Sequence, residues 1–495
     1  MNTIDWMKKW AEYTPEKVAL EEYESGRQIT YRELHCCASH LASDFQQRGI
    51  RKGDRVMLLA EPCIENAILL SVAQKTGIIL VPVSYRLSPP EIQYLIEHSE
   101  PSLILAEQKF IRQIEACRLT EHTSLRSLED VREFCESKKH FSIERISNEV
   151  IKEEDPLFIL YTSGTTGFPK GAIYTHKMLF WNSINTSISL DLSPEDTTVS
   201  CMPVFHTGGW NVLLTPLLHR GGKVYLLKKF EADTILRLID EKRLDLFFGV
   251  PTMLKMMMES PEFASTELFS IRYFVVGGEA LPLHVINAWH LKGIRIRQGY
   301  GLTEVGPNLT SLHQKDAIRK LGSIGRPNFY VETKIITETG QEANINTVGE
   351  LCLRGPMVTP GYWKNPEATR KAIVQEWFHT GDLVKQDEEG YLYVVDRKKN
   401  MFISGGENVY PVEVERVLMQ FEHVAEAAVI GIAHEKWGEV GKAFVVPKKY
   451  QEIDMEALKE FCLQNLAKFK VPKYFTFIEA LPKTESGKIN RKGLL

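Results

Sequence analysis

The feature that most constrains the fold is a repeated unit in which an amphipathic helical pattern is followed by a short strand pattern. One such unit runs over Tyr31–Arg48 and Arg55–Ala60, and another over Ala232–Lys242 and Leu244–Gly249. This alternation predicts an α/β architecture, because a helix between two strands returns the chain to the sheet in the same direction. We therefore expect mostly parallel sheets covered by helices.

Two changes of pattern divide the chain, which at 495 residues is long enough for two or three domains of roughly 100–200 residues each. From about Gly322, short strands alternate with polar turns, which predicts a β-rich subdomain that closes the large domain. After Val395 the segment DRKKNMFISGGENVYP combines charges, two glycines and a proline ahead of a helical pattern at Val412–Met419. We predict an N-terminal domain over 1–395, a hinge over 396–400 and a small, mobile C-terminal α+β domain over 401–495.

Charge and composition exclude several kinds of partner. The 60 lysines and arginines against 64 acidic residues leave a net charge of −4 with both signs spread along the chain, so we expect no nucleic-acid partner. The eight cysteines form no CxxC pair and have no histidine at zinc spacing, which is typical of a reduced, cytoplasmic protein. A homodimer is a further expectation.

No segment has the pattern of a leader or of a membrane span. The N-terminal MNTIDWMKKWAEYTPEK carries charges and aromatic residues where a signal peptide needs an unbroken apolar core. The most apolar stretch, Ala67–Val83, is interrupted by Gln74 and Lys75 and is shorter than the roughly 20 residues that cross a bilayer. We interpret it as a buried helix followed by a strand, and expect no integral membrane segment.

A loop rich in glycine and hydroxyl residues gives the strongest local signal of function: YTSGTTGFPKGAIYTH, over 161–176. Small residues let backbone N–H groups approach an anion, hydroxyls add donors and a lysine adds charge, so the segment suits phosphates. It is not a Walker A loop, because the lysine is followed by glycine. A flexible surface turn is the alternative, but turns rarely combine these residues. The candidate ligands are Thr162, Ser163, Gly164, Thr165, Thr166, Gly167 and Lys170.

The pentapeptide YGLTE, over 300–304, suits a nucleotide. Tyr300 can stack on a base, Gly301 adds flexibility, Thr303 can donate to a phosphate and Glu304 can hold Mg²⁺. Short polar strings with an aromatic residue also arise by chance. Taken alone, this motif does not decide between the two interpretations.

Two later motifs are also ambiguous when taken alone. FHTGD, over 378–382, places Asp382 beside a glycine turn, which suits two ribose hydroxyls, and Arg397 follows it. The alternative is a turn aspartate and a solvated basic run. PKTESGKINRK, over 482–492, places Lys488 between a glycine and an isoleucine, which indicates a loop that presents one ammonium group instead of a frayed tail.

In this order, and over nearly the whole chain, the motifs resemble those of the adenylate-forming superfamily of acyl- and aryl-CoA synthetases, luciferases and peptide-synthetase adenylation domains. The resemblance implies a large and a small domain with ATP and a carboxylic acid bound between them, and a rotation of the small domain between two half-reactions. The acid would attack Mg²⁺·ATP to give an acyl-adenylate and pyrophosphate, and coenzyme A would then displace AMP. Neither step needs a protein nucleophile, which fits the lack of a GxSxG elbow or a Cys–His pair.

The resemblance also implies roles for individual residues. Thr162 and Glu304 correspond to the Mg²⁺ ligands, and Lys488 to the lysine that bridges the carboxylate and the α-phosphate during adenylation. Lys399 falls at the hinge position, and Gly406 corresponds to the glycine that leaves room for the pantetheine arm of coenzyme A. The remaining nucleotide contacts are Gly278, Glu279, Ala280 and Tyr300 around adenine, with Asp382 and Arg397 around the ribose.

The acid pocket is expected along 206–210, 248–252, 277–280 and 301–307, with His206, Trp210, Gly277 and Gly301 as lining residues. These segments hold no arginine or lysine to pair a second carboxylate, which favours an apolar monocarboxylic acid; we expect a medium- or long-chain fatty acid. His206 resembles the residue at the mouth of the family's acid site, although a lone histidine is more often part of a core. Trp210 resembles the gate tryptophan of long-chain fatty acyl-CoA synthetases, with core filling as an equal alternative.

Other functions compete with this hypothesis. An aryl- or cinnamoyl-type CoA ligase is the second hypothesis, because a glycine-rich pocket floor also admits a flat ring. A peptide-synthetase domain is disfavoured, since His206 stands where those domains usually place an aspartate and no carrier domain follows Leu495. A nucleotide-binding pseudoenzyme is disfavoured because every catalytic position is filled, and nothing favours luciferase-like oxidation. Peripheral membrane attachment lacks the basic amphipathic helix that it needs.

Overall fold

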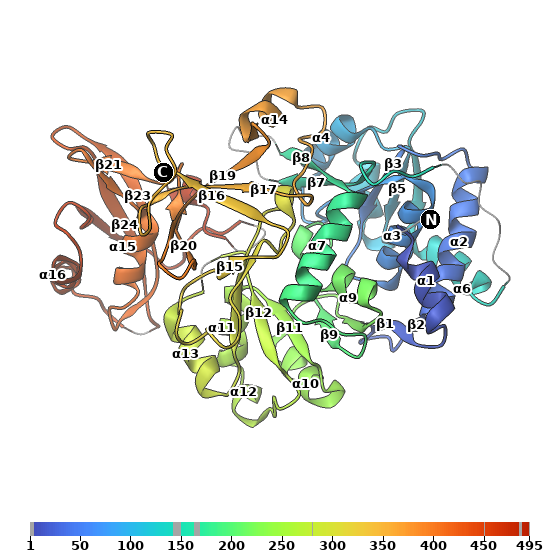
Figure 1. Cartoon of the computed structure of the whole chain (residues 1–495), viewed down its shortest axis with the longest axis horizontal. Helices are drawn as coiled ribbons and strands as arrows, with labels where there is room; N and C mark the ends of the chain where they lie inside the picture. The colour runs from blue at the N-terminus through green and yellow to red at the C-terminus, as the bar shows by residue number, and fades with distance from the viewer. Residues whose placement is uncertain are drawn as a thin grey trace. The chain divides into compact units, whose positions relative to one another are not determined.

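The computed structural model describes residues 4–141, 150–162, 169–279, 281–449, 451–484 and 488–494 (Figure 1). The chain divides into two compact units, each with its own sheets and core. Unit 1 comprises 1–321, 325–332 and 353–378, and unit 2 comprises 322–324, 333–352 and 379–495. A division by compactness does not locate a hinge, so the boundaries 1–395, 396–400 and 401–495 stay a prediction.

The first sheet of unit 1 is parallel except at one edge. Its strand order is β6 (Ser124–Ser127), β5 (Leu103–Ala106), β3 (Arg55–Leu59), β4 (Ile79–Pro82), β7 (Pro156–Thr162) and β8 (Lys170–Thr175). Neighbours from β6 to β7 pair in parallel, and β8 returns antiparallel to β7. Strands β3, β4 and β5 are apolar and buried over almost their whole length, as expected for parallel strands covered on both faces.

The second sheet of unit 1 has a parallel centre and antiparallel edges. Its strand order is β15 (Arg326–Pro327), β14 (Thr310–Ser311), β13 (Ile296–Tyr300), β12 (Tyr273–Val276), β11 (Leu246–Gly249), β9 (Thr197–Ser200), β10 (Lys223–Leu226), β1 (Val18–Glu22) and β2 (Gln28–Thr30). The strands from β13 to β1 pair in parallel, so the carboxyl ends of β9, β11, β12 and β13 share one edge. This edge positions the candidate site.

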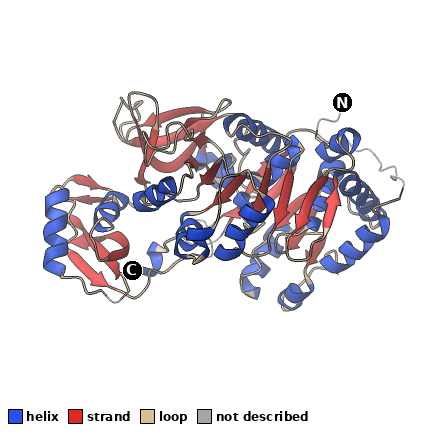
Figure 2. Cartoon of the chain, turned by 90° about the horizontal axis from the view of Figure 1, so that it is seen from below, coloured by secondary structure: helices blue, strands red, loops and turns tan. Residues whose placement is uncertain are grey.

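Helices flank the strands of unit 1 (Figure 2). They are α1 (Trp6–Tyr13), α2 (Tyr31–Gln47), α3 (Ile64–Thr76), α4 (Pro89–Ser99), α5 (Ile111–Glu115), α6 (Leu128–Lys138), α7 (His176–Ser189), α8 (Thr207–Asn211), α9 (Leu214–Arg220), α10 (Ala232–Lys242), α11 (Pro251–Glu259), α12 (Glu262–Ser265), α13 (Leu283–Leu291) and α14 (Pro366–Ala372), with 3-10 turns η1 (Gln108–Phe110) and η2 (Thr303–Val305). Helix α2 begins at a capping box in which Thr30 and Glu33 each accept a backbone N–H of the other. The stretch Ala67–Val83, predicted as a buried helix followed by a strand, forms most of α3 and β4. Among the described helices, none has the length and apolar content to cross a bilayer.

Unit 2 contains the β-rich segment that the change of pattern at Gly322 predicts. One sheet, most of whose residues belong to unit 2, has the order β16 (Glu332–Ile336), β17 (Gly349–Arg354), β19 (Trp377–Gln386) and β18 (Ile373–Val374), and β20 (Leu392–Arg397) also pairs with β19; β18 itself belongs to unit 1. The other has the order β22 (Glu407–Val409), β21 (Phe402–Ser404), β24 (Gly438–Pro447) and β23 (Val424–His434), and β25 (Tyr474–Phe477) pairs with β24. Helix α15 (Pro411–Leu418) packs beside β23 and beside α16 (Met455–Asn465), and η3 (Arg491–Leu494) follows (Figure 1). The predicted α/β class and the α+β character of the C-terminal part are confirmed.

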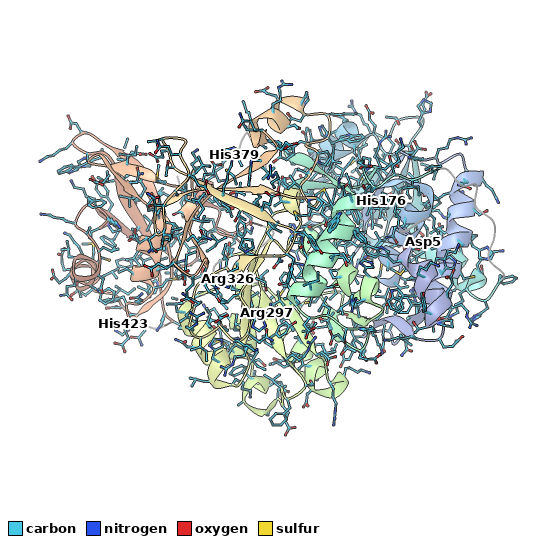
Figure 3. The ribbon with its side chains drawn as sticks, in the orientation of Figure 1. Asp5, His176, Arg297, Arg326, His379 and His423 are labelled. Atoms are coloured by element: carbon cyan, nitrogen blue, oxygen red, sulfur yellow. The ribbon has the colours of Figure 1, made fainter. Side chains whose placement is uncertain are left out.

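Three buried histidines make the stability of unit 1 depend on pH. Burial lowers the pKa of His35, His176 and His219 to about 4 each, with Lys75 adding to the effect at His35; Figure 3 labels His176. Because an unfolded histidine titrates near 6.5, the unfolded chain binds more protons between pH 6.5 and 4. The stabilising contribution is therefore complete above pH 6.5 and is lost as the pH falls towards 4.

We expect the free energy of unfolding of the wild type to fall between pH 6.5 and 5. Each buried histidine contributes about 1.4 kcal/mol per pH unit to this slope. His176→Gln should make the slope shallower by about 1.4 kcal/mol per pH unit. Urea unfolding at pH 7.5, 6.0 and 5.0 measures the slope of each protein. Equal slopes in the wild type and His176→Gln would contradict the assignment.

Candidate active site

The two ends of the predicted phosphate loop lie opposite each other on neighbouring strands. Thr162 and Lys170 are the last cross-strand pair of β7 and β8 before the loop, and Thr162 Oγ1 lies 3.4 Å from the Lys170 carbonyl oxygen. The hairpin therefore fixes where the loop leaves and re-enters the sheet. The predicted ligands between them, Ser163, Gly164, Thr165, Thr166 and Gly167, lie outside the described residues.

The structure brings the two predicted Mg²⁺ ligands together, although they are 142 positions apart. Glu304 lies in η2, and its Oε1 accepts a hydrogen bond from Thr162 Oγ1 at 3.4 Å. The Glu304 carbonyl accepts the Thr359 N–H at 2.7 Å, which holds the backbone of η2 in place. One carboxylate and one hydroxyl fit Mg²⁺, since proteins commonly hold this ion through one or two carboxylates together with substrate phosphates and water.

The predicted adenine-binding segments follow two neighbouring parallel strands. Because β12 and β13 pair in parallel, 277–279 and 300–301 emerge at the same edge of the sheet, which is where open α/β sheets bind ligands. Glu279 is exposed and Tyr300 is half-buried. Ala280, predicted beside them, lies outside the described residues. The structure thus brings the two predicted nucleotide segments together at one edge.

Glycines at this edge allow backbone to pass where a side chain would not fit. A Cβ on Gly301 would lie 2.2 Å from the Pro307 carbonyl oxygen, so the turn after β13 closes only around glycine. Gly278 has a φ of +90°, which L side chains rarely adopt. Thr303 follows in η2 and is half-buried. The YGLTE motif is therefore a compact turn that places Glu304 beside the phosphate hairpin.

The two side chains predicted at the acid site have different surroundings. His206 is half-buried at the N-cap of α8, with its ring centroid 4.6 Å from that of Phe205. Trp210 has no exposed surface; its indole N–H donates to the Val204 carbonyl, and its ring packs against Phe158 at 5.1 Å between centroids. These contacts favour core filling over a gate at Trp210.

Phe248 lies between two of the glycine-lined segments predicted for the acid. A Cβ on Gly208 would lie 3.5 Å from its ring, and a Cβ on Gly277 would lie 3.9 Å from it. The ring is 8% exposed, so it is held by packing on most sides. Flat glycine surfaces on either side of an aromatic ring make an apolar lining without charged groups.

In unit 2 the residues predicted to bind the ribose form a cross-strand ion pair. Asp382 on β19 is opposite Arg397 on β20, and Arg397 Nε donates to Asp382 Oδ1 at 2.8 Å. Asp382 is buried, whereas the Arg397 side chain is 44% exposed. Loss of hydration and the neighbouring cations Arg397 and Lys492 lower the pKa of Lys399, the predicted hinge residue. The antiparallel register therefore brings together the two residues that the sequence predicts as a clamp.

A tight hairpin and an isolated β-bridge in unit 2 hold the segments that carry the remaining predicted residues. Gly405 and Gly406 connect β21 to β22 with φ angles of +62° and +90°, the backbone that a two-residue hairpin turn requires. Lys488 is exposed, and its carbonyl accepts the Thr484 N–H at 2.7 Å beside a bridge between Lys483 and Ile489. The described residues on either side of 485–487 are therefore hydrogen-bonded to each other, and the role of Lys488 stays a prediction.

Comparison with known proteins identifies the family. Residues 7–363 match the AMP-binding enzyme family, and residues 413–488 match the AMP-binding enzyme C-terminal domain. The chain belongs to the AMP-binding enzyme family. It is 34% identical to a feruloyl-CoA synthase of Amycolatopsis sp over 484 residues, covering 98% of this chain and 96% of that protein. It is also 34% identical to a long-chain-fatty-acid–CoA ligase of Mycobacterium tuberculosis over 505 residues, covering 99% and 97%.

Solved structures agree with this membership. ATP-bound MatB from Rhodopseudomonas palustris superposes with a TM-score of 0.89 at 29% identity, covering 99% of this chain and 98% of that one. The predicted resemblance and the enzyme class, an AMP-forming acid–CoA ligase, are confirmed at the level of the AMP-binding enzyme family. The expected use of ATP, Mg²⁺ and coenzyme A is confirmed at the same level. The roles of individual residues stay predictions.

Two residues of this AMP-binding enzyme escaped the sequence analysis. The Tyr362 hydroxyl donates to Glu304 Oε1 at 3.0 Å. Glu350 accepts the Gly381 N–H at 3.1 Å and Lys398 Nζ at 3.1 Å, next to Asp382. Burial opposes the charge of Glu350, but the bonds from Lys398 and His379, labelled in Figure 3, hold its pKa below the ordinary value. No local pattern marks either residue, because each acts through strand pairing with a distant segment.

Proposed function

We propose that this protein is an ATP-dependent acid–CoA ligase that activates an apolar monocarboxylic acid. The acid displaces pyrophosphate from ATP to give an acyl-adenylate, and coenzyme A then displaces AMP to give the thioester. The observation that carries the proposal is the contact between Glu304 Oε1 and Thr162 Oγ1, which places a carboxylate beside the mouth of the phosphate hairpin. This arrangement suits a bound phosphate group together with its metal cation, because Lys170 and the cation both offset the negative charge of the phosphates.

In this mechanism the chain contributes position and charge and no nucleophile. Thr162 and Glu304 would hold Mg²⁺, which when bound would neutralise charge on the phosphates. Lys488 brings an ammonium group to the carboxylate and the α-phosphate, where the adenylation transition state gathers negative charge. Asp382, oriented by Arg397, accepts the ribose hydroxyls. Residues 401–495 then rotate about 396–400. This rotation removes Lys488 from the acyl-adenylate and brings the Gly406 turn to it.

For the acid itself we propose a medium- or long-chain fatty acid as the first candidate. The segments along 206–210, 248–252 and 277–279 carry no lysine or arginine, and Phe248 lies between Gly208 and Gly277. An apolar lining without a cation stabilises an alkyl chain and leaves a second carboxylate without a partner. Because Trp210 is buried, the support comes from this lining and not from a gate.

The second candidate is an aryl or cinnamoyl-type acid. The observation that favours it is the pair of glycine surfaces against Phe248, since a flat ring fits beside a backbone that lacks Cβ atoms and can stack on the phenyl group. The relative from Amycolatopsis is a feruloyl-CoA synthase, and another from Aromatoleum aromaticum is an indoleacetate–CoA ligase. Both candidates share the mechanism and differ in the shape of the acid.

One activity screen tests both the reaction and the choice of acid. Purified protein is given ATP, Mg²⁺ and coenzyme A with octanoate, palmitate, benzoate, coumarate or malonate, and AMP and pyrophosphate are measured. We expect the highest kcat/KM with octanoate or palmitate and none above background with malonate. A maximum with benzoate or coumarate would replace the first candidate by the second. ATP bound without AMP release for any acid would contradict the ligase and favour the pseudoenzyme.

Two expectations about the setting of the enzyme accompany this proposal. A homodimer stays a prediction, which light scattering of the purified protein measures directly. A cytoplasmic location stays a prediction that cell fractionation tests. The proposed reaction requires neither.

A further inference from the structure

Tyr362 contacts two of the side chains predicted to handle ATP and its metal. Its hydroxyl donates to Glu304 Oε1 at 3.0 Å, and Lys170 Nζ lies 5.3 Å from the centroid of its ring. The phenol O–H is the hydrogen-bond donor in this contact, and the Glu304 oxygen is the acceptor. One ring thus connects the predicted metal ligand to the predicted phosphate lysine.

The backbone around Tyr362 is fixed to the strand that begins at Lys170. Ala172 of β8 and Tyr362 form an antiparallel bridge. On either side of it, Trp363 N–H donates to the Gly171 carbonyl at 2.7 Å and Ile173 N–H to the Gly361 carbonyl at 3.0 Å. These bonds make the segment an added edge to the phosphate hairpin. The phenol is therefore delivered from the same rigid sheet that carries the phosphate loop.

A second set of bonds fixes the segment from its other side. Tyr362 N–H donates to Thr369 Oγ1 at 2.9 Å in α14, and the Asn365 side chain caps the first turn of that helix. Thr359 N–H donates to the Glu304 carbonyl at 2.7 Å, so one short segment holds Glu304 by both its backbone and its side chain. Such anchoring from both sides suits a group whose task is to orient another.

We propose that Tyr362 is a positioning residue that holds the Glu304 carboxylate in the orientation that binds Mg²⁺ with ATP. The bonds from Tyr362 and Thr162 both go to Oε1, so together they hold that oxygen in place and neither occupies Oε2. Partners that orient a metal ligand contribute to affinity without touching the metal. This inference rests on the proposed function, because it takes Glu304 as the metal ligand.

The test removes one oxygen atom and measures metal binding without turnover. Wild type and Tyr362→Phe are titrated with Mn²⁺ in the presence of ATP and the absence of acid, and free Mn²⁺ is read by electron paramagnetic resonance. Loss of an orienting partner of this kind typically weakens a metal site by about 10-fold or more. We expect Tyr362→Phe to show that loss. In acid-dependent pyrophosphate exchange, the Mg²⁺ concentration at half-maximal rate should rise by a similar factor, while saturating Mg²⁺ restores most of kcat.

Tyr94→Phe is the matched control, because it deletes a phenol oxygen next to the same loop but at a different acceptor. The Tyr94 hydroxyl donates to the Pro169 carbonyl at 3.3 Å. We expect its Mn²⁺ affinity to equal that of the wild type. Glu304→Gln removes the carboxylate ligand itself, so it should bind Mn²⁺ more weakly than Tyr362→Phe. Thermal unfolding of each variant shows whether the fold survives, and binding is measured well below the lowest midpoint.

The outcomes separate the inference from the proposed function. Equal Mn²⁺ affinity in Tyr362→Phe and wild type would overturn the positioning role. A loss of kcat in Tyr362→Phe that high Mg²⁺ does not restore would also overturn it, because the residue would then act on something other than the metal. A wild type that binds Mn²⁺ with ATP but catalyses no acid-dependent exchange would contradict the proposed ligase function. The binding titration would still test the positioning role of Tyr362.

Discussion

Replacing Lys488 with alanine is expected to lower the rate of acyl-adenylate formation by about 10³-fold, while preformed acyl-adenylate is still converted to thioester. The adenylation transition state joins two anions and gathers charge on the α-phosphate, so the loss of one ammonium group falls on that step. The Lys488 carbonyl accepts the Thr484 N–H. Because this bond uses backbone atoms only, we expect it to survive the substitution.

Lys483→Ala is the control for this prediction. Lys483 forms a β-bridge with Ile489, the neighbour of Lys488, and its ammonium pairs with Glu426 at 2.9 Å. Its replacement should leave both half-reactions within a few-fold of the wild type. Pyrophosphate exchange measures the first half-reaction, and thioester formation from synthetic acyl-adenylate measures the second. An equal loss of both in Lys488→Ala would show that the lysine acts on the fold or on nucleotide binding in general.

Replacing Gly406 with leucine is expected to have the opposite effect. Thioester formation should fall by about 10²-fold or more, because a side chain at the turn displaces the attacking thiol, while adenylation continues. In this structure the position is open, since a Cβ on Gly406 would meet no atom of the described residues within 4 Å. Leucine should therefore fit the folded chain, at the cost of a φ of +90° that disfavours side chains. The two half-reaction assays used for Lys488 measure the result.

Gly340→Leu is the control for the loss of stability that a side chain causes at a backbone with positive φ. Gly340 also lies in unit 2, has a φ of +79° and has open space around it among the described residues. It should lose a similar amount of thermal stability and keep both half-reactions. Normal thioester yield in Gly406→Leu would contradict the role assigned to this glycine. A loss of both half-reactions in both variants would show that strain alone explains the effect.

Much of the fold follows from local pattern. The segment Ala232–Lys242 forms α10 with those bounds, and Arg55–Ala60 forms β3 with one residue fewer, because helical and strand periodicity act over short distances. Turn chemistry was equally informative: two adjacent glycines before β22 form the tight hairpin that carries Gly406. The order of the strands in each sheet is set by long-range pairing and is not readable from such patterns.

In the candidate site, too, local motifs predicted some residues, and long-range pairing determined others. Thr162 and Glu304 were predicted from their motifs, and the structure places them in contact. Tyr362 was missed, because its role appears only when 359–363 pairs with β8, far earlier in the chain. The pattern around Trp210 suggested a gate and a core residue equally, and only its packing against Phe158 favours the core. Motifs identify chemistry, whereas burial and pairing decide what a side chain does.

The path of the carboxylate oxygen tests the central claim most directly. The acid with the highest kcat/KM in the screen is labelled with ¹⁸O in its carboxylate and converted with ATP, Mg²⁺ and coenzyme A. If the reaction passes through an acyl-adenylate, AMP released in each turnover contains one ¹⁸O, and pyrophosphate contains none. Label in inorganic phosphate with formation of ADP would instead show an acyl-phosphate, and would contradict adenylation.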